Sequence, residues 1–203
     1  MSDHNPSATQ SVKFSDRLDP VESREDLPPH WLDSPIEEFI GAHNFGKEIE
    51  GASQPRLLIV SCIEFRFRPQ IPNNFAYVIR SAGGRMSNLA GSEFALSYIF
   101  AKGVKHIAIV GHNDCGMTKV DQFKPALIEA LIDQGWEKEK AGAFIEENAG
   151  RFAMDDEIES LRREFLRLRS LFNNVVIAPL FVSLASNRLH IPSWHAIYKS
   201  DNQ

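Results

Sequence analysis

The sequence has the length and composition of one soluble domain. Its 203 residues are 43% hydrophobic, enough to bury a sizeable core, and its formal net charge is -5. This negative charge excludes a general attraction to nucleic acid or to an anionic membrane, so we expect small solutes or another protein as partners. The chain shows no signal peptide and no run that approaches the roughly 18 apolar residues of a membrane span, which predicts a cytoplasmic protein.

The N-terminal part of the chain differs in character from the rest. Residues 1–33 are polar and charged, and they are interrupted by Pro20, Pro28 and Pro29. This composition predicts an irregular arm with little core of its own, which lies on a partner where it is ordered. From residue 34 the apolar pattern becomes regular, so we expect a single domain over residues 34–203.

One helix and four strands are predicted in the first part of this domain and at its end. Ser34 is a suitable N-cap, Pro35 suits the first helical position, and the helix that they begin weakens near Gly46. Near-continuous apolar runs are typical of strands that are covered on both faces, and four such runs occur, at 56–61, 75–80, 105–111 and 174–182.

Helices are predicted between these strands. Residues 88–103 favour a helix that ends at Gly103, and residues 118–173 form a mostly helical insertion. Strands that alternate with helices are typical of parallel sheets with right-handed crossovers. The predicted fold class is therefore α/β, with a central parallel sheet of about four strands flanked by helices.

Both cysteines of the chain follow predicted strands. Cys62 comes directly after the first strand, whereas His112 and Cys115 come directly after the third. The carboxyl ends of parallel strands meet at one edge of a sheet, where open α/β proteins place their sites. Two thiolates and one imidazole suit Zn²⁺, and three protein ligands leave a fourth position open. We therefore expect one zinc ion per chain at this edge.

Four short segments are similar to one known family. They are "CIEFR" at 62–66, "VIRSAGG" at 78–84, "GSEFAL" at 91–96 and "HNDCGM" at 112–117. The chain resembles the β-class carbonic anhydrases, whose pattern is Cys-x-Asp-x-Arg followed by His-x-x-Cys, and within them the smaller microbial branch with an HTDCGM-like motif. The resemblance covers about 55–185.

The resemblance implies a site, an activity and an assembly. It makes Cys62, His112 and Cys115 the zinc ligands, and Glu64 with Arg66 the catalytic acid and arginine pair. The implied reaction is the reversible hydration of carbon dioxide to bicarbonate by a metal-bound hydroxide. It also implies a homodimer or a larger homo-oligomer, in which the N-terminal arm embraces the partner.

Two further features lie close to these motifs in the sequence. Gly83 and Gly84 lie between a strand and a helix, where backbone amides bind anions such as bicarbonate, although a tight turn that needs both glycines is an equal alternative. Asp114 precedes Cys115 and is a candidate for orienting the ligands, although a turn-forming aspartate would occur there equally often.

The chain departs from the family at Glu64, where the family has aspartate. The extra methylene moves the carboxylate by roughly one carbon-carbon bond, and a misplacement of about 1 Å can cost on the order of a hundredfold in rate. Two alternatives on the same site therefore stay open. One is a carbonyl sulfide or carbon disulfide hydrolase, and the other is a zinc-binding homologue with a regulatory or structural role. A dithiol redox protein that uses Cys62 and Cys115 is a weaker third.

Overall fold

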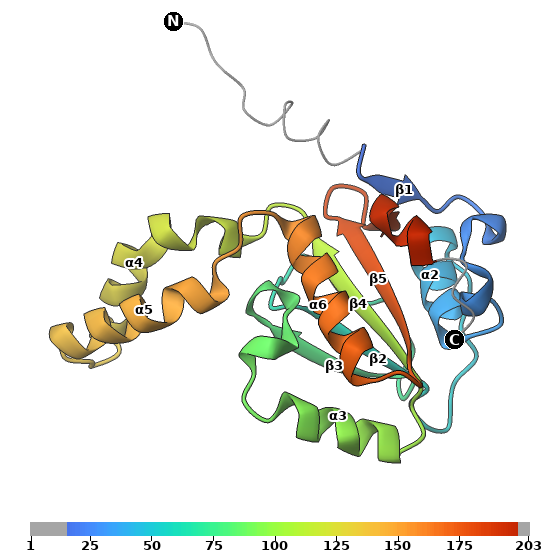
Figure 1. The fold of residues 1–203 in the computed structure, drawn as a ribbon, viewed down its shortest axis with the longest axis horizontal. Coiled ribbons are helices and arrows are strands. Elements are labelled where there is room, and N and C mark those ends of the chain that lie inside the picture. The colour runs from blue at the N-terminus through green and yellow to red at the C-terminus, as the bar shows by residue number, and fades with distance from the viewer. Residues whose placement is uncertain (1–15, 199–203) are drawn as a thin grey trace, which may run out of the picture.

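A six-stranded sheet forms the centre of the computed structural model, which describes residues 16–198 (Figure 1). The strands lie in the order β1-β6-β5-β4-β2-β3. Four of them are parallel, namely β2 (Leu57–Cys62), β3 (Ala76–Ser81), β4 (His106–His112) and β5 (Val176–Ser183). These four strands confirm the α/β class and the four predicted strands. Each strand begins and ends one or two residues later than predicted.

Two short antiparallel strands extend the sheet beyond the predicted four. β6 (Arg188–Pro192) returns alongside β5, and β1 (Leu18–Pro20) pairs with β6. The turn between β5 and β6 contains Asn187 at φ 54°, in the left-handed region that asparagine tolerates. The sheet is therefore mixed and not wholly parallel, because strands of three and five residues leave too little apolar pattern to detect in the sequence.

Part of the predicted arm belongs to the core of its own chain. Val21, Leu27 and Trp31 are buried, and the Asn44 side chain donates to the carbonyl oxygens of Val21 and Leu189 at 3.2 and 2.8 Å. The expectation of an irregular arm with little core is wrong for this part. The sequence did not show this burial, because the few apolar residues are scattered among charges. Residues 1–15 of the predicted arm lie outside the described residues.

Within residues 16–198, five α-helices accompany the sheet, namely α2 (Pro35–Phe45), α3 (Ser92–Ala101), α4 (Val120–Asp133), α5 (Lys138–Phe152) and α6 (Glu157–Leu171). Ser34 caps α2 as predicted, since its hydroxyl accepts the Ile36 amide at 3.2 Å, and Gly46 ends this helix at φ 64°. Helices α4 and α5 form a hairpin that projects from the body in Figure 1. Short 3₁₀ helices occur at Arg24–Asp26, Pro29–Trp31, Ala82–Gly84, Met86–Asn88, Gly116–Lys119 and Ser193–Tyr198.

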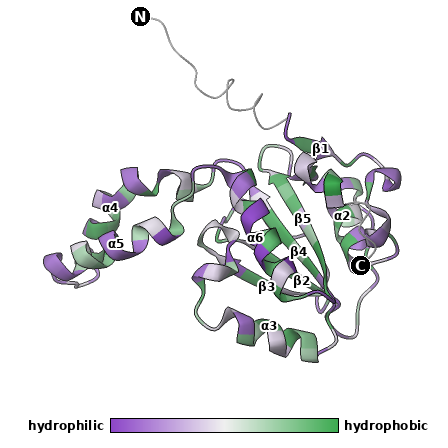
Figure 2. Cartoon of the chain, in the orientation of Figure 1, coloured by the Kyte–Doolittle hydropathy of each residue, from purple (hydrophilic) through white to green (hydrophobic). Residues whose placement is uncertain are grey.

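Apolar side chains cover both faces of the sheet, which is why its strands are the most hydrophobic part of the chain (Figure 2). Leu57 and Ile59 of β2 face one core, which includes buried residues of α2, whereas Leu58 and Val60 face a second core with α3 and α6. None of the helices between residues 16 and 198 combines the length and hydrophobicity that a membrane crossing requires.

Candidate metal centre

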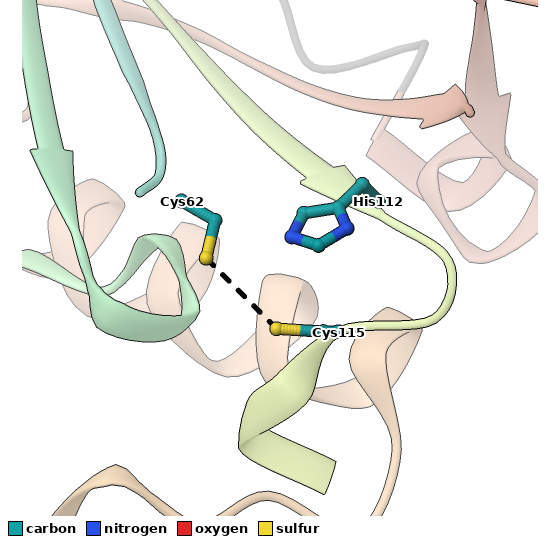
Figure 3. A group of neighbouring side chains, drawn as sticks. All are labelled: Cys62, His112 and Cys115. Atoms are coloured by element: carbon teal, nitrogen blue, oxygen red, sulfur yellow. Dashed lines mark hydrogen bonds between the residues drawn. The ribbon is translucent and has the colours of Figure 1, made fainter. Parts of the chain in front are cut away.

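The three predicted metal ligands come together at the carboxyl end of the sheet. Cys62 ends β2 and His112 ends the neighbouring parallel strand β4, and a turn brings Cys115 back toward them (Figure 3). Their ligand atoms lie within 4.8 Å of one another, and the two sulfurs are 3.9 Å apart. All three residues are buried, with exposed fractions of 5, 4 and 3%.

The turn between the second and third ligands is held from outside. Asp114 adopts φ 54°, a left-handed conformation that lets the chain reverse within the H-x-x-C spacing. The Asn113 side chain accepts the Leu184 amide at 2.9 Å, which ties the turn to the end of β5. Gly111 lies tightly packed beneath it, since a Cβ there would approach the Phe181 ring to 3.2 Å.

The His112 ring is oriented to bind a metal through Nε2. Its Nδ1 lies 2.9 Å from the carbonyl oxygen of Asn113, an acceptor, so Nδ1 carries the proton and donates. In the neutral ring Nε2 then keeps its lone pair, and this atom is buried and makes no hydrogen bond. A buried nitrogen lone pair beside two sulfurs fits the donor set of zinc.

The two cysteines share a proton when no cation is near. The two sulfurs are close enough for one thiol to donate to the other. This hydrogen bond lowers the pKa of Cys62, and the same bond together with burial raises the pKa of Cys115 above its ordinary value. Removing the second proton requires a positive charge between the sulfurs. A divalent cation supplies that charge, which is why metal binding by thiolates releases protons.

Glu64 and Arg66 lie in the turn after β2, because the strand ends at Cys62. Arg66 donates to the Glu64 carboxylate from Nε, Nη2 and its backbone amide at 2.7, 2.7 and 2.8 Å. These bonds lower the pKa of Glu64 to about 2, so it is ionised. The Glu64 carboxylate is not a member of the 4.8 Å group, and its Oε2 lies 3.9 Å from His112 Nδ1. Glu64 is therefore paired with arginine beside the metal ligands.

Arg66 is also tied to the turn that carries the third ligand. Its Nη1 donates to Asp114 Oδ2 at 3.1 Å, and Lys119 donates to the other carboxylate oxygen at 3.1 Å. Asp114 thus holds the arginine that orients Glu64. Sequence reasoning singled out Asp114 without this partner and missed Lys119, which no motif marks.

The two glycines between β3 and α3 line the metal centre. Gly83 and Gly84 have left-handed φ values of 72° and 69° and lie in the wall of the cavity that contains the ligands. The Gly83 amide donates to the Cys62 sulfur. A Cβ at Gly83 would lie 2.6 Å from Met154 Cε, the flexible end of a side chain that can move aside, so the left-handed φ is the stronger reason for glycine here.

Helix α6 and the segment after Gly84 close the inner side of the centre. Glu157 accepts the Cys115 amide at 3.3 Å, and a cavity of about 10 Å³ beside the sulfurs is lined by Arg85, Ser160 and Glu164 among others. Sequence reasoning missed these residues. Those in α6 lie far from Cys62 in the sequence, and the signal in α6 was its apolar stripe alone.

No family model matches the sequence, and no curated protein matches it at a significant level. Solved structures do match. The β-carbonic anhydrase isoform I of Trichomonas vaginalis is 20% identical over 77% of this chain and 92% of its own chain, with a TM-score of 0.56. The carbonic anhydrase of Glaciozyma antarctica is 19% identical over 93% of this chain and 98% of its own, with a TM-score of 0.51.

A third solved structure is that of a carbon disulfide hydrolase in its apo form. It is 20% identical over 74% of this chain and 85% of its own chain, with a TM-score of 0.51. At these identities the likeness concerns the fold. The chain therefore has the α/β fold of the β-carbonic anhydrases and carries a potential Cys-His-Cys metal site at the carboxyl end of its sheet.

Proposed function

We propose that the chain is a zinc enzyme that hydrates carbon dioxide reversibly to bicarbonate. The observation that carries this proposal is the pairing of a buried Cys-His-Cys triad with a Glu64–Arg66 ion pair beside it. Zinc, when bound, supplies an acidified water as the nucleophile near neutral pH. Cys62, Cys115 and Nε2 of His112 would hold it.

Glu64 has the geometry of a fixed hydrogen-bond acceptor. Its Oε1 takes two donors from Arg66, the backbone amide and Nε, whereas Oε2 takes only Nη2. A carboxylate oxygen has two lone pairs, so Oε2 keeps one, and this oxygen is the one 3.9 Å from His112. Glu64 can thus accept a hydrogen bond from the reacting water and orient the water's lone pair toward carbon dioxide, while the bidentate pair with Arg66 keeps the carboxylate from turning.

The test is stopped-flow carbon dioxide hydration by zinc-quantified protein between pH 6.5 and 9. We expect a rate that rises with pH, because two thiolate ligands cancel the charge of the ion and make a bound water less acidic than three neutral ligands would. Zinc-replete protein with no rate above buffer at any pH in this range would overturn the proposal.

Hydrolysis of carbon disulfide or carbonyl sulfide is a second candidate. The carbon disulfide hydrolase among the structural neighbours shares the fold of this chain, so the same scaffold accommodates a larger linear substrate in that protein. Sulfide release by the zinc-loaded protein, measured in parallel with carbon dioxide hydration, separates the two. Sulfide release without hydration would favour this second candidate.

Two non-hydratase alternatives predict different results. A regulatory or structural homologue closed by Glu64 needs that carboxylate on the metal, whereas here it is bound to Arg66. If the site were closed by Glu64, the variant Glu64→Asp would create carbon dioxide hydration activity. A dithiol redox protein would not retain stoichiometric zinc through mild chelation, so zinc retention counts against it.

We also propose that the chain forms a homo-oligomer through the exposed surface at Ile63 and Phe65, beside the Glu64–Arg66 pair. Ile63 and Phe65 flank Glu64 and are 61 and 82% exposed, an unusual setting for large apolar side chains. A second copy that covers them would also keep water from the Glu64–Arg66 pair. Phe65→Ser should lower the molar mass measured by light scattering, whereas the same change at exposed Leu171 on α6 should not.

A further inference from the structure

Helix α6 carries a polar stripe on a side that faces the core. Glu157, Ser160 and Glu164 recur every three or four residues, as core-facing positions of a helix do, and they lie beside the buried apolar residues Ile158, Leu161, Phe165 and Leu168. Ser160 and Glu164 are each only 2% exposed. Burying a polar group without a partner is costly, so each member of this stripe needs a hydrogen bond.

The two outer members of the stripe have partners near the metal centre. Glu157 accepts the Cys115 amide at 3.3 Å. Glu164 accepts the Met86 amide at 3.1 Å and pairs with Arg167 at 2.8 Å. Ser160 lies between them on the same face, and its buried hydroxyl makes no hydrogen bond within the protein.

Arg85 contributes a second buried donor that makes no hydrogen bond within the protein. Its Nη2 donates to the carbonyl oxygens of Arg151 and Ala153 at 2.7 and 3.3 Å, which fixes the guanidinium at the end of α5. Its Nε is buried and makes no hydrogen bond. Arg85 immediately follows the two glycines at the metal centre, and its Nε lies 3.8 Å from where a Cβ of Gly83 would be.

These two groups and the metal ligands share one small cavity. Its volume is about 10 Å³, and its wall includes Arg85 and Ser160 together with Cys62, His112 and Cys115. A metal would satisfy His112 Nε2, the third polar atom in this wall without a hydrogen bond. It would not satisfy Arg85, because a guanidinium has no lone pair to offer. The remaining two groups therefore need a hydrogen-bond acceptor.

We infer that the cavity binds one water molecule held by Arg85 Nε and Ser160 Oγ, on the inner side of the metal centre. The volume matches roughly one water molecule. The wall carries the positive charge of Arg85 but two carboxylates, Glu157 and Glu164, which would repel an anion and can accept the hydrogens of a water, so water suits it better. The cysteine sulfurs in the same wall are further acceptors.

Water in this inner site would connect the metal ligands to helix α6 through hydrogen bonds. Hydrogen bonds to the metal ligands themselves are worth about 10- to 100-fold in metal affinity, and the water would make such bonds to the cysteine sulfurs in the same wall. The site lies away from the Glu64–Arg66 pair, since neither residue is in the cavity wall. The inference therefore does not depend on which substrate the protein acts on.

Crystals of the zinc-loaded protein test the site directly. We expect a peak of water size within hydrogen-bond distance of both Arg85 Nε and Ser160 Oγ, with no anomalous signal after crystals are soaked in bromide. A bromide peak at this position would overturn the inference in favour of a monatomic anion. The absence of any peak would overturn it altogether.

A matched pair of serine variants tests what the site does. Ser160→Ala should abolish the peak and speed the loss of zinc to a chelator about tenfold. Ser97→Ala is the control, because Ser97 is exposed on α3 and its hydroxyl donates to the Glu93 carbonyl oxygen at 2.8 Å, away from the centre. Equal rates of zinc loss in the two variants would show that the water does not support the metal ligands.

Discussion

The metal-ligand triad and the Glu64–Arg66 pair lie side by side but are held in different ways. The triad is carried by two adjacent buried strands and a turn, and its residues are at most 5% exposed. The pair lies in a turn beyond the strand, and the Arg66 side chain is 40% exposed, with Asp114 and Lys119 at the surface behind it.

If the proposed function is right, this difference separates metal binding from catalysis. Moving a triad residue requires moving the sheet. Glu64 and Arg66, in contrast, are held by ion pairs that solvent screens, and exposed ion pairs contribute about 0–1 kcal/mol each. Substitutions in the triad should therefore remove the metal and the activity together. Substitutions in the pair and behind it should leave the metal in place and change activity in graded steps.

The largest effect is expected for Cys115→Ser. The variant keeps the size of the side chain but removes the thiolate that zinc prefers, leaving two ligands. Zinc content by atomic absorption should fall from one per chain to below about a tenth, and carbon dioxide hydration to the buffer rate. Full zinc retention in this variant would show that other residues hold the metal.

Arg66→Gln should keep the zinc but lose most of the activity. Without the bidentate donor the Glu64 carboxylate can turn, and a displacement of about 1 Å costs on the order of a hundredfold in rate. Arg68→Gln is the matched control, since Arg68 is an exposed arginine two residues further along. Similar losses in both variants would mean that general charge, and not the orientation of Glu64, sets the rate.

Glu64→Asp is expected to lower the hydration rate by up to about a hundredfold. The shorter side chain cannot keep its three bonds to Arg66 and at the same time present a free lone pair toward the metal ligands. Zinc content should not change. A rate above that of the parent protein would contradict the open arrangement and favour a site that Glu64 closes.

The Glu64–Arg66 pair should also contribute to stability in a defined pH window. Arg66 lowers the pKa of Glu64 from 4.5 to about 2, so this contribution is complete above the unfolded value and is lost as the pH falls from about 5 toward 2. Screening at the exposed arginine limits it to about 1 kcal/mol. Urea unfolding at pH 7 and pH 3 should show a smaller pH dependence for Glu64→Gln than for the parent protein.

The smallest effect is expected for Asp114→Asn. Asparagine tolerates the left-handed φ of 54°, so the variant removes the charge that holds Arg66 and keeps the turn. The exposed pair is worth less than about 1 kcal/mol, so the hydration rate should fall less than about fivefold with zinc content unchanged. A loss of zinc would show that Asp114 acts on the ligand turn itself and not on Arg66.

Much of the scaffold could be predicted from local pattern. The four parallel strands, the Ser34-capped helix and the apolar stripe of α6 each appear in the sequence, because buried strands and amphipathic helices repeat over many residues. β1 and β6 could not be predicted in this way. The five residues of β6 pair with the edge that β5 presents, and the three residues of β1 then pair with β6.

Local pattern was enough to predict Cys62, His112 and Cys115 as candidate metal ligands, since they follow strands whose carboxyl ends must meet. The direction of Glu64 follows from folding, because a turn after β2 and an arginine two residues away set it. Folding also brought Arg85 and Ser160 to the inner side of the centre. Strand ends follow from local periodicity, whereas contacts between residues far apart in the chain depend on how the helices pack on the sheet.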